Sequence, residues 1–275
     1  GLWQDRLSGS VDFFYRKTTD MLFSVPVAPT LGYTSYYDNI GDMSNTGIEV
    51  VLNGDIFRTK NVVWSVNANL TWVKNKVLSL PESRKDRIVD GHAGFISGST
   101  FLAEGLPLNT LYIHEYAGVE EGTGKSMWNK YYPEVKNEET GEVVTPAKWE
   151  ATSDYGSISS DQDSKKLYDS TMADVFGGFN TTLYAYGFDL SIAFDYQLGG
   201  HTIDGTYAGY MSPSTSASLG KNYHLDLLDA WDKETNPNSQ IPRFQYADEY
   251  VNATSTRFLI SSNYLNISNI NAGYN

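Results

Sequence analysis

The sequence predicts an all-β protein, an antiparallel β-barrel of the kind that crosses a membrane with strands. Three observations predict it: segments that alternate between apolar and polar residues, connections that alternate between long and short, and aromatic residues spaced along the apolar side of two segments. Aromatic residues make up 14% of the 275 residues, with 20 tyrosines, and glycine (24) far outnumbers proline (9). This composition favours strands.

Eight segments alternate with a two-residue period. The predicted strands are 6–17, 47–57, 62–73, 110–117, 125–131, 176–185, 188–198 and 257–274. Successive side chains of a strand point to opposite faces, so each segment has one apolar and one polar face. Any antiparallel sheet with one solvated side alternates in the same way, so the pattern alone leaves a β-sandwich open.

In a membrane barrel the apolar set is expected to face lipid and the polar set to face the lumen. The apolar set includes Trp64, Val66, Leu70, Trp72, Leu190, Ile192 and Phe194. The candidate lumen-facing residues are Asn67, Asn69, Asp189, Asp195 and Gln197.

The connections between these segments alternate strictly in length. The long ones are 18–46, 74–109, 132–175 and 199–256, and the short ones are 58–61, 118–124 and 186–187. Strict alternation places every long loop at the same end of the sheet. Transmembrane barrels are built in this way, with short periplasmic turns and long extracellular loops, whereas Greek-key sandwiches have long connections at both ends.

Aromatic residues lie eight positions apart on the apolar side of two segments. Trp64 and Trp72 form one pair, and Phe188 and Tyr196 form the other. Eight residues span roughly 26 Å along a strand, or about 20 Å of height at a tilt of about 40°. That height suits the two aromatic girdles of a membrane barrel, although packing against a second sheet would place aromatics here as well.

Composition excludes several other classes of function. A net charge of −13 and a pI near 4.6 argue against binding to nucleic acid or to anionic lipid surfaces, and no cysteine is present. The four histidines (His92, His114, His201 and His224) fall in four different segments. No nucleophile elbow, P-loop or dinucleotide-binding motif occurs. We therefore expect no enzyme, no catalytic residue, no metal site and no cofactor.

Three stretches resemble the SusC/RagA family of TonB-dependent outer-membrane transporters. Asn39-Ile-Gly-Asp-Met-Ser-Asn-Thr-Gly-Ile-Glu49 is similar to the family's NxGxxxNxGxE signature. Phe176-Gly-Gly-Phe-Asn-Thr-Thr-Leu-Tyr-Ala-Tyr-Gly-Phe-Asp-Leu-Ser191 resembles its GGFNTS hairpin. Arg257-Phe-Leu followed by Tyr264-Leu-Asn-Ile-Ser-Asn-Ile-Asn-Ala-Gly-Tyr-Asn275 resembles its RFL…LGYN run. Ala173, Asn266 and Ser268 depart from the residues common in the family, which puts in doubt any charged role for the last strand.

The resemblance implies a barrel of about 22 strands with a plugged lumen, in the outer membrane of a Gram-negative, Bacteroidetes-like bacterium. It implies import of glycans or oligopeptides, energised through TonB and capped by a SusD-like surface lipoprotein. The chain begins at Gly1 without a signal peptide. We therefore expect 1–275 to be a partial, C-terminal portion of the barrel that lacks the plug, the TonB-contact segment and the last strands.

The loop 132–175 and its flanks carry the candidate contacts to substrate or partner. These are Trp128, Tyr131, Tyr132, Trp149 and Tyr155, in a stretch with twelve acidic residues, six lysines and no arginine. Aromatic faces beside carboxylates suit sugar rings, so we expect a neutral or weakly charged substrate, an oligosaccharide before an anionic peptide or polyanion. The alternative is that these aromatics only pack the loops together or against the lipoprotein.

Two further functions fit the same pattern of strands. A secreted carbohydrate-binding or adhesive β-sandwich would bury the apolar face between two sheets. A passive porin would have the barrel but neither a plug nor a TonB-contact segment.

Overall fold

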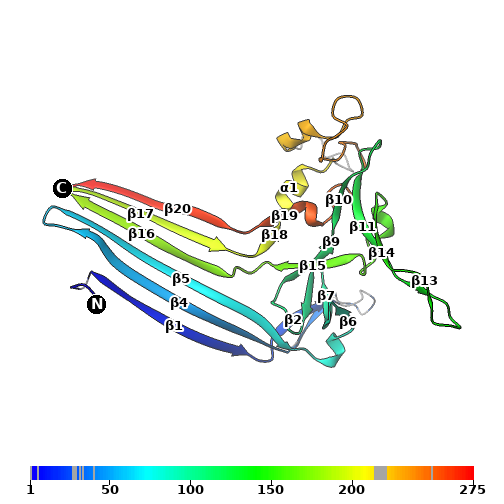
Figure 1. Cartoon of the computed structure of the whole chain (residues 1–275), viewed down its shortest axis with the longest axis horizontal. Helices are drawn as coiled ribbons and strands as arrows, with labels where there is room; N and C mark the ends of the chain where they lie inside the picture. The colour runs from blue at the N-terminus through cyan, green and yellow to red at the C-terminus, as the bar shows by residue number, and fades with distance from the viewer. Residues whose placement is uncertain are drawn as a thin grey trace. The chain divides into compact units, whose positions relative to one another are not determined.

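The computed structural model describes residues 2–275 except 5, 27–29, 31, 33, 40, 214–221 and 249. Ile40 of the predicted loop signature thus lies outside the described residues. Six long strands form one antiparallel sheet in the order β1-β4-β5-β16-β17-β20 (Figure 1). They are β1 (Leu7–Thr18), β4 (Asp42–Arg58), β5 (Val62–Ser79), β16 (Val175–Ala185), β17 (Phe188–Leu198) and β20 (Tyr264–Tyr274). The prediction of an all-β antiparallel fold is confirmed.

The register places most apolar residues of the six strands on one face. Val11 pairs with Val50, which pairs with Leu70, and farther along the sheet Ile192 pairs with Ile270. Trp64 and Leu70 keep 42% and 38% of their surface exposed, and Ile192 is only partly buried. Among the described residues no second sheet covers this face, which a β-sandwich would bury, so the β-sandwich interpretation is wrong.

The opposite face of the sheet is polar and rich in asparagine. The amide of Asn67 donates to Asn53 at 2.7 Å, and the amide of Asn75 donates to Asn45 at 2.8 Å. The Ser191 hydroxyl donates to the side-chain oxygen of Asn180 at 3.0 Å. Side chains of adjacent strands therefore bond to one another along this face, which we call the polar face.

Two tight turns join neighbouring strands at one end of the sheet. Residues 59–61 connect β4 to β5, and Tyr186 and Gly187 connect β16 to β17. Both turn residues have positive φ, 50° for Tyr186 and 91° for Gly187, as a two-residue hairpin of type I′ requires. The prediction of a hairpin turn at this dipeptide is confirmed.

The long connections leave from the other end, but they number three rather than four: 19–41, 80–174 and 199–263. The predicted strands 110–117 and 125–131 are not part of the six-stranded sheet, so that part of the prediction is wrong. They form β9 (Thr110–His114), β10 (Tyr116–Val119) and β11 (Ser126–Tyr132), which belong to smaller sheets. All five residues of β9 are buried, so this strand has no solvated side. The first part of 257–274 is also outside the large sheet.

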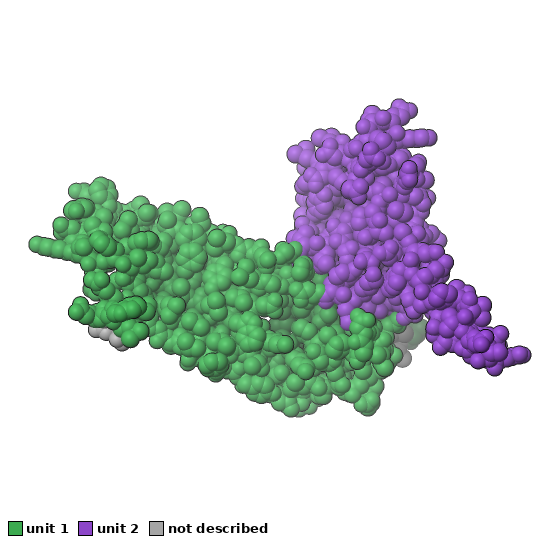
Figure 2. Space-filling model, in the orientation of Figure 1, with its two compact units in different colours: residues 1–111, 169–201, 261–275 green, residues 112–168, 202–260 purple. Residues whose placement is uncertain are grey.

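The chain divides into two compact units, which Figure 2 shows in different colours. Unit 1 comprises 1–111, 169–201 and 261–275, and it contains the six-stranded sheet. It also holds β2 (Leu22–Pro26) paired with β3 (Ser35–Asn39), the short helix η2 (Glu82–Arg84), and β6 (Arg87–Val89), β7 (His92–Ser97) and β8 (Thr100–Ala103). These last three lie in a five-stranded sheet with β9 and β15 (Lys165–Ser170). Val77, Leu80, Phe95 and Leu102 form a small core.

Unit 2 comprises 112–168 and 202–260. Its largest sheet joins β10, β11 and β14 (Lys148–Thr152), and β12 (Val135–Lys136) pairs with β13 (Val143–Thr145). The remaining elements are η3 (Tyr155–Ser157), α1 (Gly205–Tyr210), η4 (Leu225–Asp229) and η5 (Thr256–Phe258), with β18 (His201–Ile203) paired to β19 (Leu259–Ser261). Ala208, Met211 and Phe258 form its core. No helix among the described residues is long and apolar enough to cross a membrane.

A glycine on β16 makes room for an aromatic ring on β17. Gly177 lies opposite Tyr196, whose hydroxyl crosses it and donates to the Asn69 carbonyl at 3.0 Å. A Cβ at Gly177 would collide with that carbonyl and with the tyrosine hydroxyl. We expect Gly177→Val to cost about 1–3 kcal/mol, because overpacking forces side chains and backbone to shift. The measurement is the heat-unfolding midpoint of the full-length protein.

Leu183→Val is the matched control for this substitution. Leu183 lies on the same face of the same strand and is 39% exposed, so its shortening creates no collision. Equal unfolding midpoints for the two variants would contradict a packing role for Gly177.

Candidate functional site

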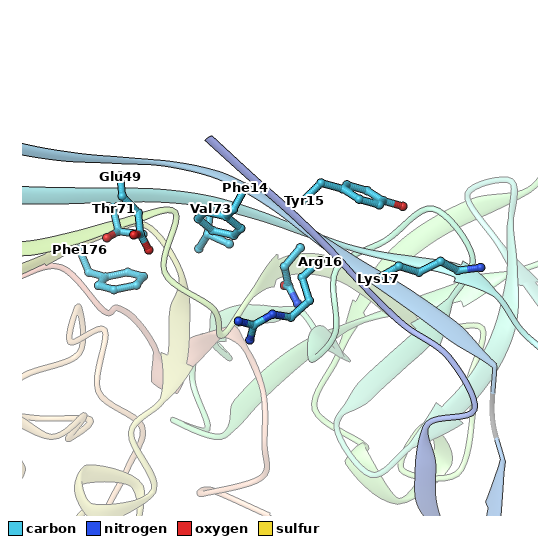
Figure 3. Close-up of a pocket in the computed structure, with 9 residues that line it drawn as sticks. Phe14, Tyr15, Arg16, Lys17, Glu49, Thr71, Val73 and Phe176 are labelled. Carbon is cyan, nitrogen blue, oxygen red and sulfur yellow. The ribbon is translucent and has the colours of Figure 1, made fainter. Parts of the chain in front are cut away.

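A groove opens on the polar face at the end of the sheet from which the long connections leave. Its volume is about 730 Å³. The lining residues are Phe14, Tyr15, Arg16, Lys17, Asn45, Glu49, Thr71, Val73 and Phe176 (Figure 3). We call it the rim groove; every lining residue belongs to unit 1.

The register arranges the groove in rows that run across the strands. In one row, Asp12 lies opposite Glu49, Glu49 opposite Thr71, and Thr71 opposite Phe176. In the next row, Phe14 lies opposite Gly47, and Gly47 opposite Val73. In the third row, Arg16 lies opposite Asn45. Side chains in directly opposed positions share a face, so these rows form one surface.

The Phe14 ring lies directly over Gly47. A Cβ at Gly47 would overlap the edge of that ring and the carbonyl oxygen of Trp72. Only glycine leaves room for the phenyl ring this close to the backbone of the neighbouring strand. This packing gives the glycine in the Asn45-Thr-Gly47 part of the signature a local physical reason.

The charged side chains of this surface differ in whether a described residue pairs with them. Among the residues that the structure describes, none forms an ion pair or a side-chain hydrogen bond with Asp12, Arg16 or Glu49. The neighbouring Lys17, on the other parity of β1, is bound to Asp42 at 2.7 Å. In Figure 3 Arg16 and Glu49 extend to the same side of the strands. Two carboxylates and one guanidinium thus lie on this surface without a partner among the described residues.

The structure places all five predicted lumen-facing residues on the polar face. Asn67 is bonded to Asn53, and Asn69 accepts from the Gly178 amide at 3.1 Å. Asp195 accepts from the Asn266 amide at 3.3 Å. Gln197 lies opposite Phe176 and so extends the row that contains Glu49, while Asp189 lies opposite Tyr184 near the short turns. That this face lines a lumen stays a prediction.

The five aromatic loop candidates do not form one site. Trp128 is 3% exposed and packs against Tyr155, with ring centroids 4.6 Å apart. The Tyr131 and Trp149 rings pack with centroids 5.2 Å apart. The ammonium groups of Lys130 and Lys148 lie over the Tyr132 ring. Tyr131 and Tyr132 are neighbours on β11 and therefore point to opposite faces. Their contact with substrate or partner stays a prediction, although a buried Trp128 ring has no free face for stacking.

A second pocket, of about 440 Å³, lies in unit 2 beside two of these aromatics. Trp128, Tyr155 and Tyr250 line it together with Asp154 and Asp248. Tyr155 packs against Tyr250 in a tilted arrangement, with ring centroids 5.2 Å apart.

His114 is buried in unit 2. Its ring nitrogens lie 3.3 Å from the Asp161 carbonyl and 3.4 Å from the Tyr155 hydroxyl. Burial lowers the pKa of the His114 imidazole, since a charged ring would lose its hydration. In the described part of the chain, no group of three or more histidine, aspartate or glutamate side chains could hold a metal ion.

The sequence pattern alone did not single out Phe14, Arg16, Glu49 and Phe176. The two-residue period already placed Asp12, Phe14 and Arg16 on one polar parity. What it could not supply was the register that brings three strands together, because pairing partners are distant in the chain.

Comparisons with known proteins agree with this architecture. Residues 2–112 match the family model described as TonB dependent receptor-like, beta-barrel. The chain is 28% identical over its whole length to TonB-dependent receptor P3 of Formosa agariphila, of which it covers 26%. It is 22% identical to TonB-dependent receptor SusC of Bacteroides thetaiotaomicron, of which it covers 25%. The chain therefore spans about a quarter of the length of these relatives.

Solved structures give the same result. The structure of the RagAB peptide transporter matches 99% of this chain with 27% identity and a TM-score of 0.73, and the match covers 27% of the solved chain. The RagAB peptide importer in its closed-closed state matches with 27% identity and a TM-score of 0.71. These proteins are receptors and transporters rather than enzymes.

Proposed function

Because the chain is a SusC/RagA-like segment of a TonB-dependent receptor barrel, we propose that it forms part of the wall of an active importer in the bacterial outer membrane. One observation carries the proposal: a single-layered sheet with a continuous apolar face and a continuous polar face. A wall between lipid and an aqueous lumen needs these two faces. The apolar face then contacts lipid, and the polar face lines the lumen.

The long connections are the outward-facing part of this importer. All three leave one end of the sheet, whereas the other end has only tight turns. In outer-membrane barrels the end with long loops faces the outside and the short turns face the periplasm. A SusD-like lipoprotein then docks on the loop side, and TonB acts from the periplasmic side.

The substrate that fits this wall is a polar oligomer without net charge. The polar face offers mainly amides and hydroxyls, such as Asn67, Asn69 and Thr71, which bond to sugar hydroxyls as readily as to peptide groups. An oligosaccharide is the first candidate, because the loops combine aromatic and acidic residues. An oligopeptide is the second, and the likeness to the RagAB peptide transporter favours it.

Energised uptake tests this function. The full-length receptor that contains this chain is expressed in a host that lacks it, and uptake of labelled oligosaccharides and oligopeptides is measured with and without the proton-motive force. We expect uptake that stops when the force is collapsed or the TonB protein is deleted. Uptake that continues unchanged would indicate a passive porin instead.

An exposed hairpin in unit 2 is the first place to test for the lipoprotein contact. Strands β12 and β13 have no buried residue, and Val144 is 65% exposed. The pairing of Tyr132 with Lys148 closes the base, so Asn-Gly can replace 133–147 as a two-residue turn. We expect the replacement to leave the protein folded and to weaken co-purification with the lipoprotein about tenfold, as loss of a central contact does.

A larger deletion, of 134–165, would not test the contact cleanly, because it would also remove β14 and the fully buried Ile158 and Ser164. A double variant, Glu138→Gln with Glu139→Gln, keeps the hairpin and changes only its charge. If the hairpin replacement altered neither co-purification nor uptake, the hairpin would not contact the lipoprotein.

A further inference from the structure

We propose that the apolar face of the sheet carries, at the end with the long connections, a binding site for a phosphorylated glycolipid of the outer leaflet. The inference rests on the proposed function, because it requires this face to contact the outer membrane. It starts from the charges of the apolar face. Among the described residues of the six long strands, those charges lie at this one end, and they belong to Lys17, Lys74 and Lys76, with Asp42 bound to the first.

The register brings the three lysines together on adjacent strands. Lys17 lies opposite Ser44, and Ser44 lies opposite Lys76. Lys74 is two residues from Lys76 on β5 and therefore shares its face. Adjacent strands are about 4.8 Å apart and two residues of a strand span about 7 Å, so the three side chains start from points about 7–12 Å apart. Long, flexible lysine side chains can converge on one ligand from these positions. We call this group the lysine patch.

The lysine patch keeps a positive charge of its own. Lys17 binds Asp42 at 2.7 Å, whereas no residue that the structure describes forms an ion pair with Lys74 or Lys76, and both are exposed. β5 lies between β4 and β16, so the strands on both sides of these two lysines are described. Three lysines less one aspartate leave two positive charges. The net charge of −13 belongs to the chain as a whole and is not the local charge of this patch.

The lysine patch lies at the depth of lipid headgroups. Trp64 and Trp72 lie near the two ends of the apolar band on β5. Lys74 and Lys76 follow Trp72 by two and four residues, which is about 5 and 10 Å of height at a tilt of about 40°. The headgroup region extends about 5–8 Å beyond the hydrocarbon on each side. Because the long connections face the outside in the proposed importer, these headgroups belong to the outer leaflet.

The row next to the apolar band suits a sugar headgroup. Tyr15 lies opposite Thr46, and Thr46 lies opposite Lys74. Tyr15 is 64% exposed, and Figure 3 shows it on the opposite side of β1 from Arg16. Its ring offers a stacking surface, and the tyrosine and threonine hydroxyls can bond to sugar hydroxyls. Phe13, two residues farther into the band, is exposed and offers contact area to an acyl chain.

Other phosphate-bearing ligands fit the patch less well. A phospholipid with a single phosphodiester brings one negative charge and no sugar ring. A phosphate monoester carries about −1.5 to −2 charges at pH 7 and more acceptor oxygens, so it matches the two positive charges better. A soluble sugar phosphate would leave the apolar surface beside the patch unused. A glycolipid with phosphate monoesters uses the lysines, the hydroxyls and the apolar surface together.

Lipid binding to the full-length receptor tests the proposal. The probes are lipid A with its phosphates, lipid A from which the phosphates have been removed, and phosphatidylglycerol. Dissociation constants are measured by native mass spectrometry in a nonionic detergent. We expect phosphorylated lipid A to bind most tightly. Lys74→Gln with Lys76→Gln should weaken it about thirtyfold, because each lysine near an anionic lipid surface contributes about fivefold. Dephosphorylated lipid A should bind the receptor and this variant equally, which also shows that the variant is folded.

Lys125→Gln with Lys233→Gln is the matched control, since it removes the same charge from two exposed positions of unit 2. It should change none of the three affinities. Unchanged binding of phosphorylated lipid A to the Lys74 and Lys76 variant would overturn the inference. Equal losses in the control would overturn it too, as would equally tight binding of phosphatidylglycerol. In each case TonB-dependent uptake by the same receptor would still support the proposed importer, whereas uptake that does not need TonB would contradict the importer itself.

Discussion

Ile192→Arg is expected to destabilise the membrane-inserted barrel by about 2–4 kcal/mol, the cost of a cationic side chain on the lipid face near the bilayer midplane. Ile192 lies four residues from Phe188 and four from Tyr196, so it is in the middle of the apolar band. Its cross-strand neighbours are Thr181 and Ile270, neither of which carries a negative charge that could form an ion pair with a guanidinium. The measurement is the urea midpoint of the full-length receptor refolded into lipid vesicles.

Ala193→Arg is the control, because it places the same arginine on the opposite face of the sheet. Ala193 is the next residue of β17 and faces Asn180 and Asn269 on the polar face. Ser191 is less suitable, because its hydroxyl is bonded to Asn180. The Ala193 variant should lose less than about 1 kcal/mol. Similar losses for both variants would contradict the assignment of the apolar face to lipid.

Phe258→Ala is expected to destabilise unit 2 by about 3–5 kcal/mol, because it removes a large side chain from the centre of a core. Phe258 is 1% exposed and packs against Ala208 and Met211. The Arg257 guanidinium lies over its ring at 4.9 Å and donates to the Val251 carbonyl at 2.7 Å. The arginine–phenylalanine pair of the third motif is therefore a structural element of unit 2.

Hydrogen exchange distinguishes destabilisation of unit 2 from destabilisation of the six-stranded sheet. Amides held within unit 2, such as Ala208 N–H to the Asp204 carbonyl, should exchange faster in the variant. Amides of β5 and β16 should keep their protection. Leu228→Ala is the control, since Leu228 lies in the same unit and is 84% exposed. Uniform loss of protection across both units would show that they unfold together, against the expectation.

The large sheet was predictable because its strands alternate over ten or more residues. Segments 62–73 and 188–198 show the pattern without interruption, and β5 and β17 contain them. The extension of β5 to Ser79 was not predicted. In this extension the two-residue period no longer separates an apolar face from a solvated polar face, because Asn75 and Val77 are buried.

The two incorrect strand assignments have a physical reason. A membrane-spanning strand needs about 9–11 residues, and β9 and β11 have 5 and 7. The length of a segment therefore distinguishes these short strands from membrane-spanning strands, whereas the alternation of apolar and polar residues does not. Short alternating segments in a long connection are equally compatible with a folded loop domain, which buries both faces of its strands.

The groove could be predicted only in part. Parity alone places Arg16 and Glu49 on polar faces, yet their proximity depends on the pairing of β1 with β4 across the connection 19–41. For the aromatic loop candidates, the sequence could not show which rings are buried. A tryptophan such as Trp128 contributes equally to the composition whether its ring is buried or exposed to a ligand.

The pairing of β5 with β16 joins strands that the connection 80–174 separates in the chain. Closing a disordered loop costs entropy that grows with the logarithm of its length, about 0.6 kcal/mol for each doubling. Much of this connection has its own strands and buried side chains, among them Phe101 and Tyr112. If these fold first, the two long strands are brought near each other before they pair, and the search for their register becomes shorter. On this hypothesis, local structure in the connection forms before the long strands pair.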